Sequence, residues 1–96
     1  MIVSFGDKIT EEIFRGLESK KSRKLQPGLK RTLRIKLDSL NYAFVLEDMK
    51  VPPGNRLEKL SENLKCFYSI RVNDQYRIIF KWTQAGPADV KLIDYH

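Results

Sequence analysis

FYSIRVNDQYRIIFKW, residues 67–82, organises the rest of this chain. β-Branched and aromatic residues fill both of its halves, and the Asn-Asp pair between them is typical of a turn. We therefore expect two antiparallel strands around a short loop. If Ile70 lies opposite Ile78, the loop holds residues 73–75 and the side chains alternate consistently between two faces. One face then collects Ile70, Ile78 and Phe80, and we expect it to be buried.

The other face of this hairpin is cationic. The same register places Arg71 directly opposite Arg77, with Lys81 further along the second strand. Like charges that lie opposite each other destabilise a sheet, and a bound anion would relieve their repulsion. The alternative is a solvated basic face with splayed side chains, and the strands alone do not decide between the two.

Length and composition limit the class of protein. The 96 residues are expected to form one domain, 1–96, with a modest core. A single cysteine, Cys66, cannot form an intrachain disulfide, which suits a reducing compartment. We expect a cytoplasmic protein without a signal peptide, a membrane span or a membrane partner. The formal charge of +6 and the pI of about 9.6 favour a polyanionic partner, nucleic acid first.

Two amphipathic helices are expected ahead of the hairpin. The first follows Asp7 or Thr10, either of which can cap a helix. The second begins near Pro27, and a stripe of leucines gives it one buried face. The leucines of that stripe are Leu29, Leu33, Leu37 and Leu40. The basic run at 20–24 is expected to be a loop, either solvated or in contact with nucleic acid.

Segments on both sides of the hairpin complete the sheet. Short strands are expected at Ile2–Phe5, Arg56–Leu60 and Asp89–Tyr95, which gives four or five strands in all. We expect a short buried connection at residues 42–50 and an irregular loop at 51–55. Because the helices come first and the strands mostly follow, the order predicts an α+β domain. Two helices would pack on one face of a mostly antiparallel sheet and leave the other face free for a ligand.

Residues that could carry chemistry are few and mostly basic. One cysteine and one histidine cannot form a zinc site at the usual spacing, so we expect neither a metal nor a cofactor. Arginines bind phosphate bidentately and an imidazole exchanges protons near neutral pH, which suits metal-free cleavage of RNA. The alternative for the last three residues is a frayed chain end. The polar set is Arg56, Glu58, Lys59, Arg71, Arg77, Asp94, Tyr95 and His96.

Several of these motifs resemble the HigB branch of the RelE/ParE-type bacterial toxins. The resemblance covers nearly the whole chain and rests on four stretches: MIVSF at the start, PPGNRLE at 52–58, YSIRVNDQYRI at 68–78 and DYH at 94–96. It implies the RelE-like microbial-RNase fold. It also implies the toxin of a type II toxin–antitoxin system, a ribosome-dependent endoribonuclease that cleaves mRNA in the A site and inhibits translation.

The resemblance also implies partners and site residues. The expected partners are a HigA-like helix-turn-helix antitoxin, the ribosome and mRNA, with DNA only indirectly through the antitoxin. The positions that match catalytic residues of the family are Glu58, Arg71, Arg77, Asp94, Tyr95 and His96. The cations expected to bind RNA around them are Arg56, Lys59, Lys65 and Lys81.

One segment departs from the family pattern. Many relatives read Lys-Gly-Asp where this chain has Ser61-Glu62-Asn63, so a lysine often linked to catalysis is missing. Lys59 or Lys65 is the candidate to replace it, and the change implies lower activity. It leaves open a non-catalytic relative that binds RNA or an antitoxin. A gyrase-poisoning toxin of the ParE kind shares the fold, but the Tyr95-His96 ending argues against it.

Overall fold

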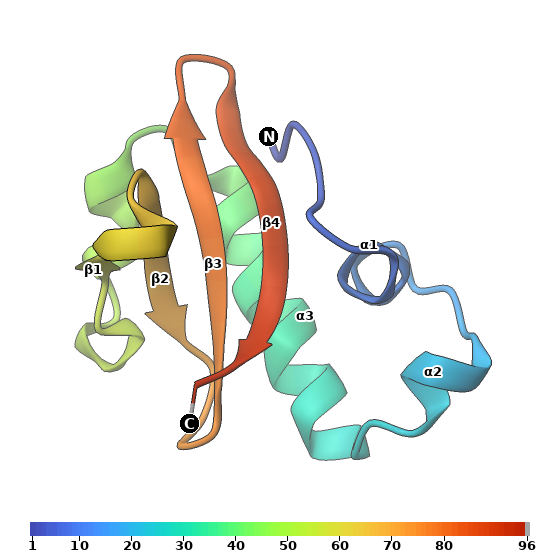
Figure 1. The fold of residues 1–96 in the computed structure, drawn as a ribbon. Helices are drawn as coiled ribbons and strands as arrows, with labels where there is room; N and C mark the ends of the chain where they lie inside the picture. The colour runs from blue at the N-terminus through green and yellow to red at the C-terminus, as the bar shows by residue number, and fades with distance from the viewer. Residues whose placement is uncertain (96) are drawn as a thin grey trace.

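The computed structural model describes residues 1–95, in which the longest helix lies across one face of a four-stranded antiparallel sheet and two shorter helices lie beside its last strand (Figure 1). Each strand pairs with its neighbour in the sequence, so the order across the sheet is β1-β2-β3-β4. The strands are β1 (Glu58–Lys59), β2 (Phe67–Arg71), β3 (Tyr76–Thr83) and β4 (Gly86–Asp94). This antiparallel sheet with its helical layer confirms the predicted α+β class.

The central hairpin has the expected register. Ile70 pairs with Ile78, and Arg71 pairs with Arg77. The side-chain oxygen of Asn73, the first loop residue, accepts hydrogen bonds from the N–H groups of Gln75 at 2.9 Å and Tyr76 at 2.7 Å. These bonds form a side-chain-stabilised turn, which explains why an Asn begins a loop of three residues here.

The longest helix, α3 (Pro27–Tyr42), packs its leucine stripe against the inner face of the sheet. Pro27 occupies its first turn, where the missing N–H is not needed. Ile70, Ile78 and Phe80 meet the leucines from the sheet side and are fully buried. The leucine stripe predicted from the sequence is buried at all four positions, Leu29, Leu33, Leu37 and Leu40.

Helix α1 (Lys8–Phe14) is attached to the sheet through its N-terminal turn. Asp7 caps it, because the Asp7 Oδ1 accepts a hydrogen bond from the backbone N–H of Thr10 at 2.9 Å. Thr10 is buried, and its Oγ1 accepts a hydrogen bond from the N–H of Leu92 in β4 at 3.0 Å. The segment before α1 makes a single parallel bridge, Phe5 with Val90, in place of the expected first strand.

A short third helix replaces the loop expected at the basic run. Helix α2 (Lys20–Arg23) has a capping box in which Ser19 and Ser22 exchange hydrogen bonds between side chain and backbone. The usual form of this motif has Glu or Gln where this chain has Ser22, so the sequence pattern did not reveal it. The backbone groups that Ser19 and Ser22 satisfy explain why this helix is stable at four residues.

The connection from α3 to β1 differs in detail from the prediction. It consists of two 3₁₀ turns, η1 (Leu46–Lys50) and η2 (Pro53–Asn55), in which Met49 and Asn55 are deeply buried and the other residues are not. The expectation of a short buried connection at residues 42–50 is wrong at Phe44, which is 93% exposed. The expected strand at Arg56–Leu60 is limited to β1, because Arg56 adopts a left-handed conformation with φ of 47°. A third 3₁₀ turn, η3 (Glu62–Leu64), follows β1.

Buried Asn55 organises this connection. Its Nδ2 donates hydrogen bonds to the carbonyl oxygens of Met49 at 3.1 Å and Val51 at 3.2 Å, and its Oδ1 accepts from Lys36 Nζ. The loop therefore has a fixed shape where it enters the sheet. Within residues 1–95, none of the helices has the length and apolar character needed to cross a bilayer.

Candidate functional site

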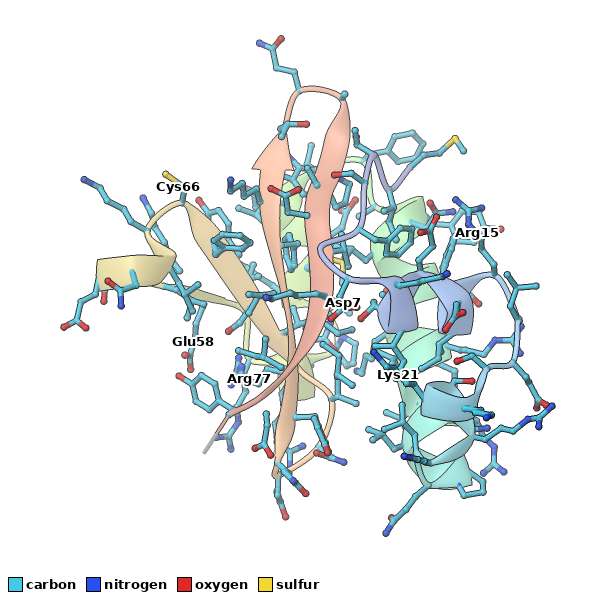
Figure 2. All side chains as sticks on the ribbon, turned by 45° about the vertical axis from the view of Figure 1, so that its right-hand side comes forward. Asp7, Arg15, Lys21, Glu58, Cys66 and Arg77 are labelled. Carbon is cyan, nitrogen blue, oxygen red and sulfur yellow. The ribbon has the colours of Figure 1, made fainter. Side chains whose placement is uncertain are left out.

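The face of the sheet that points away from α3 carries the predicted basic residues, and we call it the open face. Alternation along each strand assigns its members, because their sequence neighbours are in the core. Cross-strand pairing then arranges them in rows, with Glu58 opposite Ser69 and Arg71 opposite Arg77. The open face comprises Glu58, Phe67, Ser69, Arg71, Arg77, Ile79, Lys81, Lys91 and Ile93. Figure 2 shows Glu58 and Arg77 on this side of the molecule.

Arg77 lies at the centre of the open face and is only 6% exposed. Its Nη2 donates a hydrogen bond to the carbonyl oxygen of Arg56 at 2.6 Å, and its Cζ lies 5.1 Å from the centroid of the Tyr95 ring. Its Nε is buried and has no hydrogen-bond partner in the described part of the chain. Both groups that hold Arg77, a carbonyl and an aromatic ring, are formally uncharged.

Arg71 lies directly opposite Arg77, but it is more exposed and has an acidic partner. It is about one-third exposed and forms an ion pair with Asp74 in the hairpin loop. Asp74 is almost fully exposed, so the ion pair is screened by solvent and contributes little to stability. Its carboxylate nevertheless offsets part of the repulsion that the facing arginines would otherwise feel. An anion is therefore not required to explain the Arg71 position alone.

Lys81 and Arg56 mark opposite sides of the open face. The Nζ of Lys81 lies 3.2 Å from Asp89 Oδ2 and 5.2 Å from the centroid of the Phe67 ring. Arg56 uses its carbonyl oxygen to hold Arg77, while its side chain is exposed. Both cations are thus close to the open face, but Lys81 is partly occupied by an acidic neighbour.

Lys59 and Lys65, which were also expected to bind RNA, are not among the residues of the open face. Lys59 follows Glu58 in β1, so alternation turns its side chain toward the opposite face of the sheet. Lys65 is exposed in the loop after η3, and no ion pair or hydrogen bond joins its side chain to the rest of residues 1–95. Ser61, which replaces the family lysine, is likewise exposed at the start of η3.

The chain end reaches the open face through Tyr95. The N–H of Tyr95 donates a 2.7 Å hydrogen bond to the carbonyl oxygen of Gln75, and this fixes the backbone that places the ring beside Arg77. Asp94 pairs with Tyr76 and accepts a hydrogen bond from Gln75 Nε2 at 3.0 Å, so its carboxylate is directed to the hairpin loop. The predicted catalytic residue His96 lies outside the described residues.

Sequence reasoning missed two members of this face. Ser69 is fully buried, and its Oγ has no hydrogen-bond partner among residues 1–95. Lys91 lies in the same row, because Ile79 pairs with both Ser69 and Lys91. Alternation around Ile70 and around Val90 was the signal that could have found them. With Ser69, Ile79 and Arg77 buried, the open face is more closed than the expectation of a fully free surface.

Buried polar groups without partners are uncommon in folded proteins. Here Ser69 Oγ and Arg77 Nε are two such groups on one face of one sheet. Both can donate a hydrogen bond, and one belongs to a cation, so the pair suits an acceptor that carries negative charge. Among residues 1–95, no group of three or more His, Cys, Asp or Glu side chains is arranged to hold a metal ion.

The whole chain also matches a known protein family. A family model described as the RelE-like toxin of the type II toxin–antitoxin system HigB matches residues 3–96. The chain belongs to the HigB-like toxins. Toxin HigB-1 of Vibrio cholerae serotype O1 is 42% identical over 96 residues, which cover 100% of this chain and 98% of that protein. The family that the sequence motifs resemble is thereby confirmed.

Two further similarities were found, one in sequence and one in fold. A Haemophilus influenzae protein described as uncharacterised is 41% identical over 59 residues, 62% of this chain and 58% of that protein. Among solved structures, a chain of the YoeB-YefM complex from Staphylococcus aureus superimposes with a TM-score of 0.63. The match covers 100% of this chain and 98% of that chain at 16% identity, and it shows the shared RelE-like fold.

Proposed function

We propose that this toxin is a ribosome-dependent endoribonuclease that acts in the cytoplasm and cleaves mRNA in the ribosomal A site. The observation that supports the proposal best is the state of Arg77. Its guanidinium is almost fully buried on the open face and contacts Tyr95, and its Nε has no hydrogen-bond partner among residues 1–95. A scissile RNA phosphate would supply the negative charge and the acceptor that residues 1–95 do not provide for this side chain.

Burial of the Arg77 guanidinium costs free energy that a bound phosphate would offset. A buried cation without a charged partner costs several kcal/mol, because its hydration is lost and not replaced. The carbonyl of Arg56 and the ring of Tyr95 offset part of this cost through a hydrogen bond and a cation–π contact. A phosphodiester bound at Arg77 would offset the rest, and arginine's planar fork matches two phosphate oxygens at once.

The reaction that suits these groups needs no metal. The 2′-hydroxyl of the RNA attacks the adjacent phosphorus, and we assign Glu58 as the base that takes its proton. A bond forms between phosphorus and the 2′-oxygen while the bond to the 5′-oxygen breaks. We assign His96 as the acid that protonates the leaving 5′-oxygen, which leaves a cyclic phosphate and a 5′-hydroxyl. Arg77 and Arg71 stabilise the charge that grows on the phosphorane oxygens.

The remaining site residues have supporting roles in this proposal. Tyr95 positions the Arg77 guanidinium, and Asp94 anchors the chain end to the hairpin loop. Arg56 and Lys81 hold the RNA backbone on either side of the scissile phosphate. Lys59 and Lys65 contact RNA or the ribosome at the β1 edge. A HigA-like helix-turn-helix antitoxin neutralises the toxin, and DNA is contacted only through that antitoxin.

A second candidate is a non-catalytic member of the family that binds RNA or an antitoxin. The replacement of the family lysine by Ser61 favours it, as do the acidic partners of Arg71 and Lys81. This candidate predicts binding that weakens as salt is added but leaves the RNA intact.

The test is cleavage of a translated message. Purified chain is added to ribosomes programmed with mRNA, and primer extension maps new 5′ ends. We expect cuts at the A-site codon by the native chain and loss of those cuts in Arg77→Ala. Arg15→Ala, which removes an exposed arginine on the helical side, serves as the matched control and should cut normally. Intact mRNA with native chain bound to the ribosome would support the second candidate.

A further inference from the structure

The positive charge of this chain is concentrated in the helical segment, away from the open face. Residues 15–36 hold nine of the 18 Lys and Arg side chains and one of the 12 acidic ones, a net charge of +8 against +6 for the whole chain. The rest of the chain is therefore slightly acidic. In Figure 2, Arg15 and Lys21 project from the helical side of the molecule, whereas Glu58 and Arg77 lie on the other side.

A groove lies within this basic segment, between the end of α1 and the exposed side of α3. Its volume is about 490 Å³. Two apolar side chains that line it are open to solvent, Leu17 at 56% and Ile35 at 60% exposed. Lys30, Arg31 and Arg34 line it as well, and none of the three forms an ion pair with another described residue. We call this feature the helical groove.

Helix α3 therefore has two different faces. Its leucine stripe packs against the sheet, whereas Arg31, Arg34, Ile35 and Asp38 fall on the opposite side at helical spacing and line the groove. Apolar side chains at such an unpartnered position are a feature of surfaces that bind another molecule. The charged part of the lining holds three cations and two carboxylates, Glu18 and Asp38, and Glu18 is already paired with Arg23. The groove thus combines an apolar floor with a small excess of positive charge.

The residues that line the helical groove indicate which kind of molecule it binds. A small molecule would need buried polar groups to orient it, but the buried polar residue of the lining, Ser22, is already used in the capping box of α2. RNA would match the cations but not the exposed Leu17 and Ile35. An amphipathic helix with acidic flanks matches both, because it places apolar residues in a groove and charges at its rim.

We propose that the helical groove docks an acidic, amphipathic segment of the antitoxin. The inference rests on the antitoxin partnership in the proposed function, and it does not depend on RNA cleavage. Leu17 and Ile35 receive the apolar side chains of that segment. Arg31 and Arg34 contact its carboxylates and set its orientation through charge complementarity.

Direct binding tests this proposal independently of activity. The probe is the product of the adjoining reading frame, purified and titrated into the full-length chain by calorimetry. Arg31→Glu combined with Arg34→Glu, and separately Leu17→Ser combined with Ile35→Ser, should each weaken binding by roughly tenfold or more, as contacts at the centre of an interface do. Circular dichroism checks that each variant is folded.

The matched control is Lys21→Glu combined with Lys24→Glu. It changes the net charge equally within the same basic segment, but neither lysine lines the groove and both are exposed. We expect binding within about threefold of the native chain, since charges outside the contact surface act mainly on the association rate and its salt dependence. Equal weakening by both charge-reversal pairs would show general electrostatic attraction and overturn the groove as the docking site, as would native affinity in the Leu17/Ile35 variant.

The RNA alternative has its own measurement. Anisotropy of a labelled single-stranded RNA oligonucleotide reports RNA affinity for the same variants. The proposal expects the Leu17/Ile35 variant to bind RNA as the native chain does. If the groove variants lose RNA binding and keep antitoxin binding, the surface belongs to RNA and the proposal is wrong.

Discussion

The open face of the sheet and the basic helical segment at residues 15–36 use positive charge in opposite ways. On the open face each of the main cations has a partner or is buried: Arg71 pairs with Asp74, Lys81 with Asp89, and Arg77 lies beneath Tyr95. In the helical segment most cations are exposed, and two of them form ion pairs within residues 1–95, Arg15 and Arg23. An exposed cation keeps its hydration and costs little free energy, whereas a buried cation loses its hydration and costs several kcal/mol. The buried Arg77 is therefore the stronger sign of function, although it is one residue among many basic ones.

The largest effect is expected when the buried cation is removed. Arg77→Ala should lower mRNA cleavage by about 10²–10³-fold, the range found when one group that stabilises transition-state charge is lost. Arg77→Lys should not restore it, because a lysine lacks the planar fork that contacts both Arg56 and a phosphate. Cleavage rates on programmed ribosomes measure this.

The free energy of unfolding distinguishes a role of Arg77 in the reaction from a role in the fold. Because Arg77 has no acidic partner among the described residues, its removal should leave the free energy of unfolding nearly unchanged or raise it. Chemical denaturation of Arg77→Ala and the native chain measures the difference. A large loss of stability would show that Arg77 serves the fold, and would weaken its assignment to the site.

A smaller effect is expected at Tyr95. Tyr95→Ala removes the ring that lies 5.1 Å from the Arg77 Cζ and should reduce cleavage by roughly tenfold, the size of a partly buried cation–π contact. Tyr95→Phe keeps the ring and should retain most of the activity. If both variants lose activity equally, the hydroxyl acts in the reaction and the ring is not merely a support for Arg77.

A smaller change, in RNA affinity, is expected when Arg71 on the open face loses its acidic partner. Asp74→Asn removes its acidic partner, so Arg71 should become more available to phosphate and RNA affinity should rise a few-fold. The salt dependence of binding should steepen at the same time, because one more cation is free to neutralise a phosphate. Unchanged affinity and unchanged salt dependence would mean that Arg71 does not contact the RNA.

The smallest effect concerns the two faces of α3. Ile35→Ala lies on the exposed side and should change the free energy of unfolding by less than about 0.5 kcal/mol. Leu33→Ala, on the buried side, is the matched comparison and should cost about 2–5 kcal/mol. Thermal or urea unfolding measures both. A large cost at Ile35 would mean that this residue packs within the chain and is not available to a partner.

The parts of the fold that were predictable depend on local patterns. Alternation between Phe67 and Trp82 predicted the hairpin register, and the leucine spacing predicted the buried face of α3. Helix α2 was not predictable, because its capping serine pair departs from the usual capping residues. The extent of β1 was not predictable either, since it depends on the left-handed backbone of Arg56.

In the candidate site, too, the features that depend on a local sequence pattern were predictable, and those that depend on distant residues were not. The strand pattern predicted that Arg71 and Arg77 share a face, and the pairing confirms it. The burial of Arg77 could not be predicted, because its neighbours Arg56 and Tyr95 are 21 and 18 positions away in the chain. Ser69 was missed for a similar reason, since it is buried through its position in the sheet and not through its own polarity.

The proposed mechanism depends on the buried guanidinium of Arg77, which binds the phosphate at which mRNA is cut. Primer extension on translating ribosomes, run side by side with native chain, Arg77→Ala and Arg15→Ala, tests it most directly. We expect A-site cuts by the native chain and by Arg15→Ala, and almost none by a folded Arg77→Ala. Cuts of native strength by Arg77→Ala would contradict it.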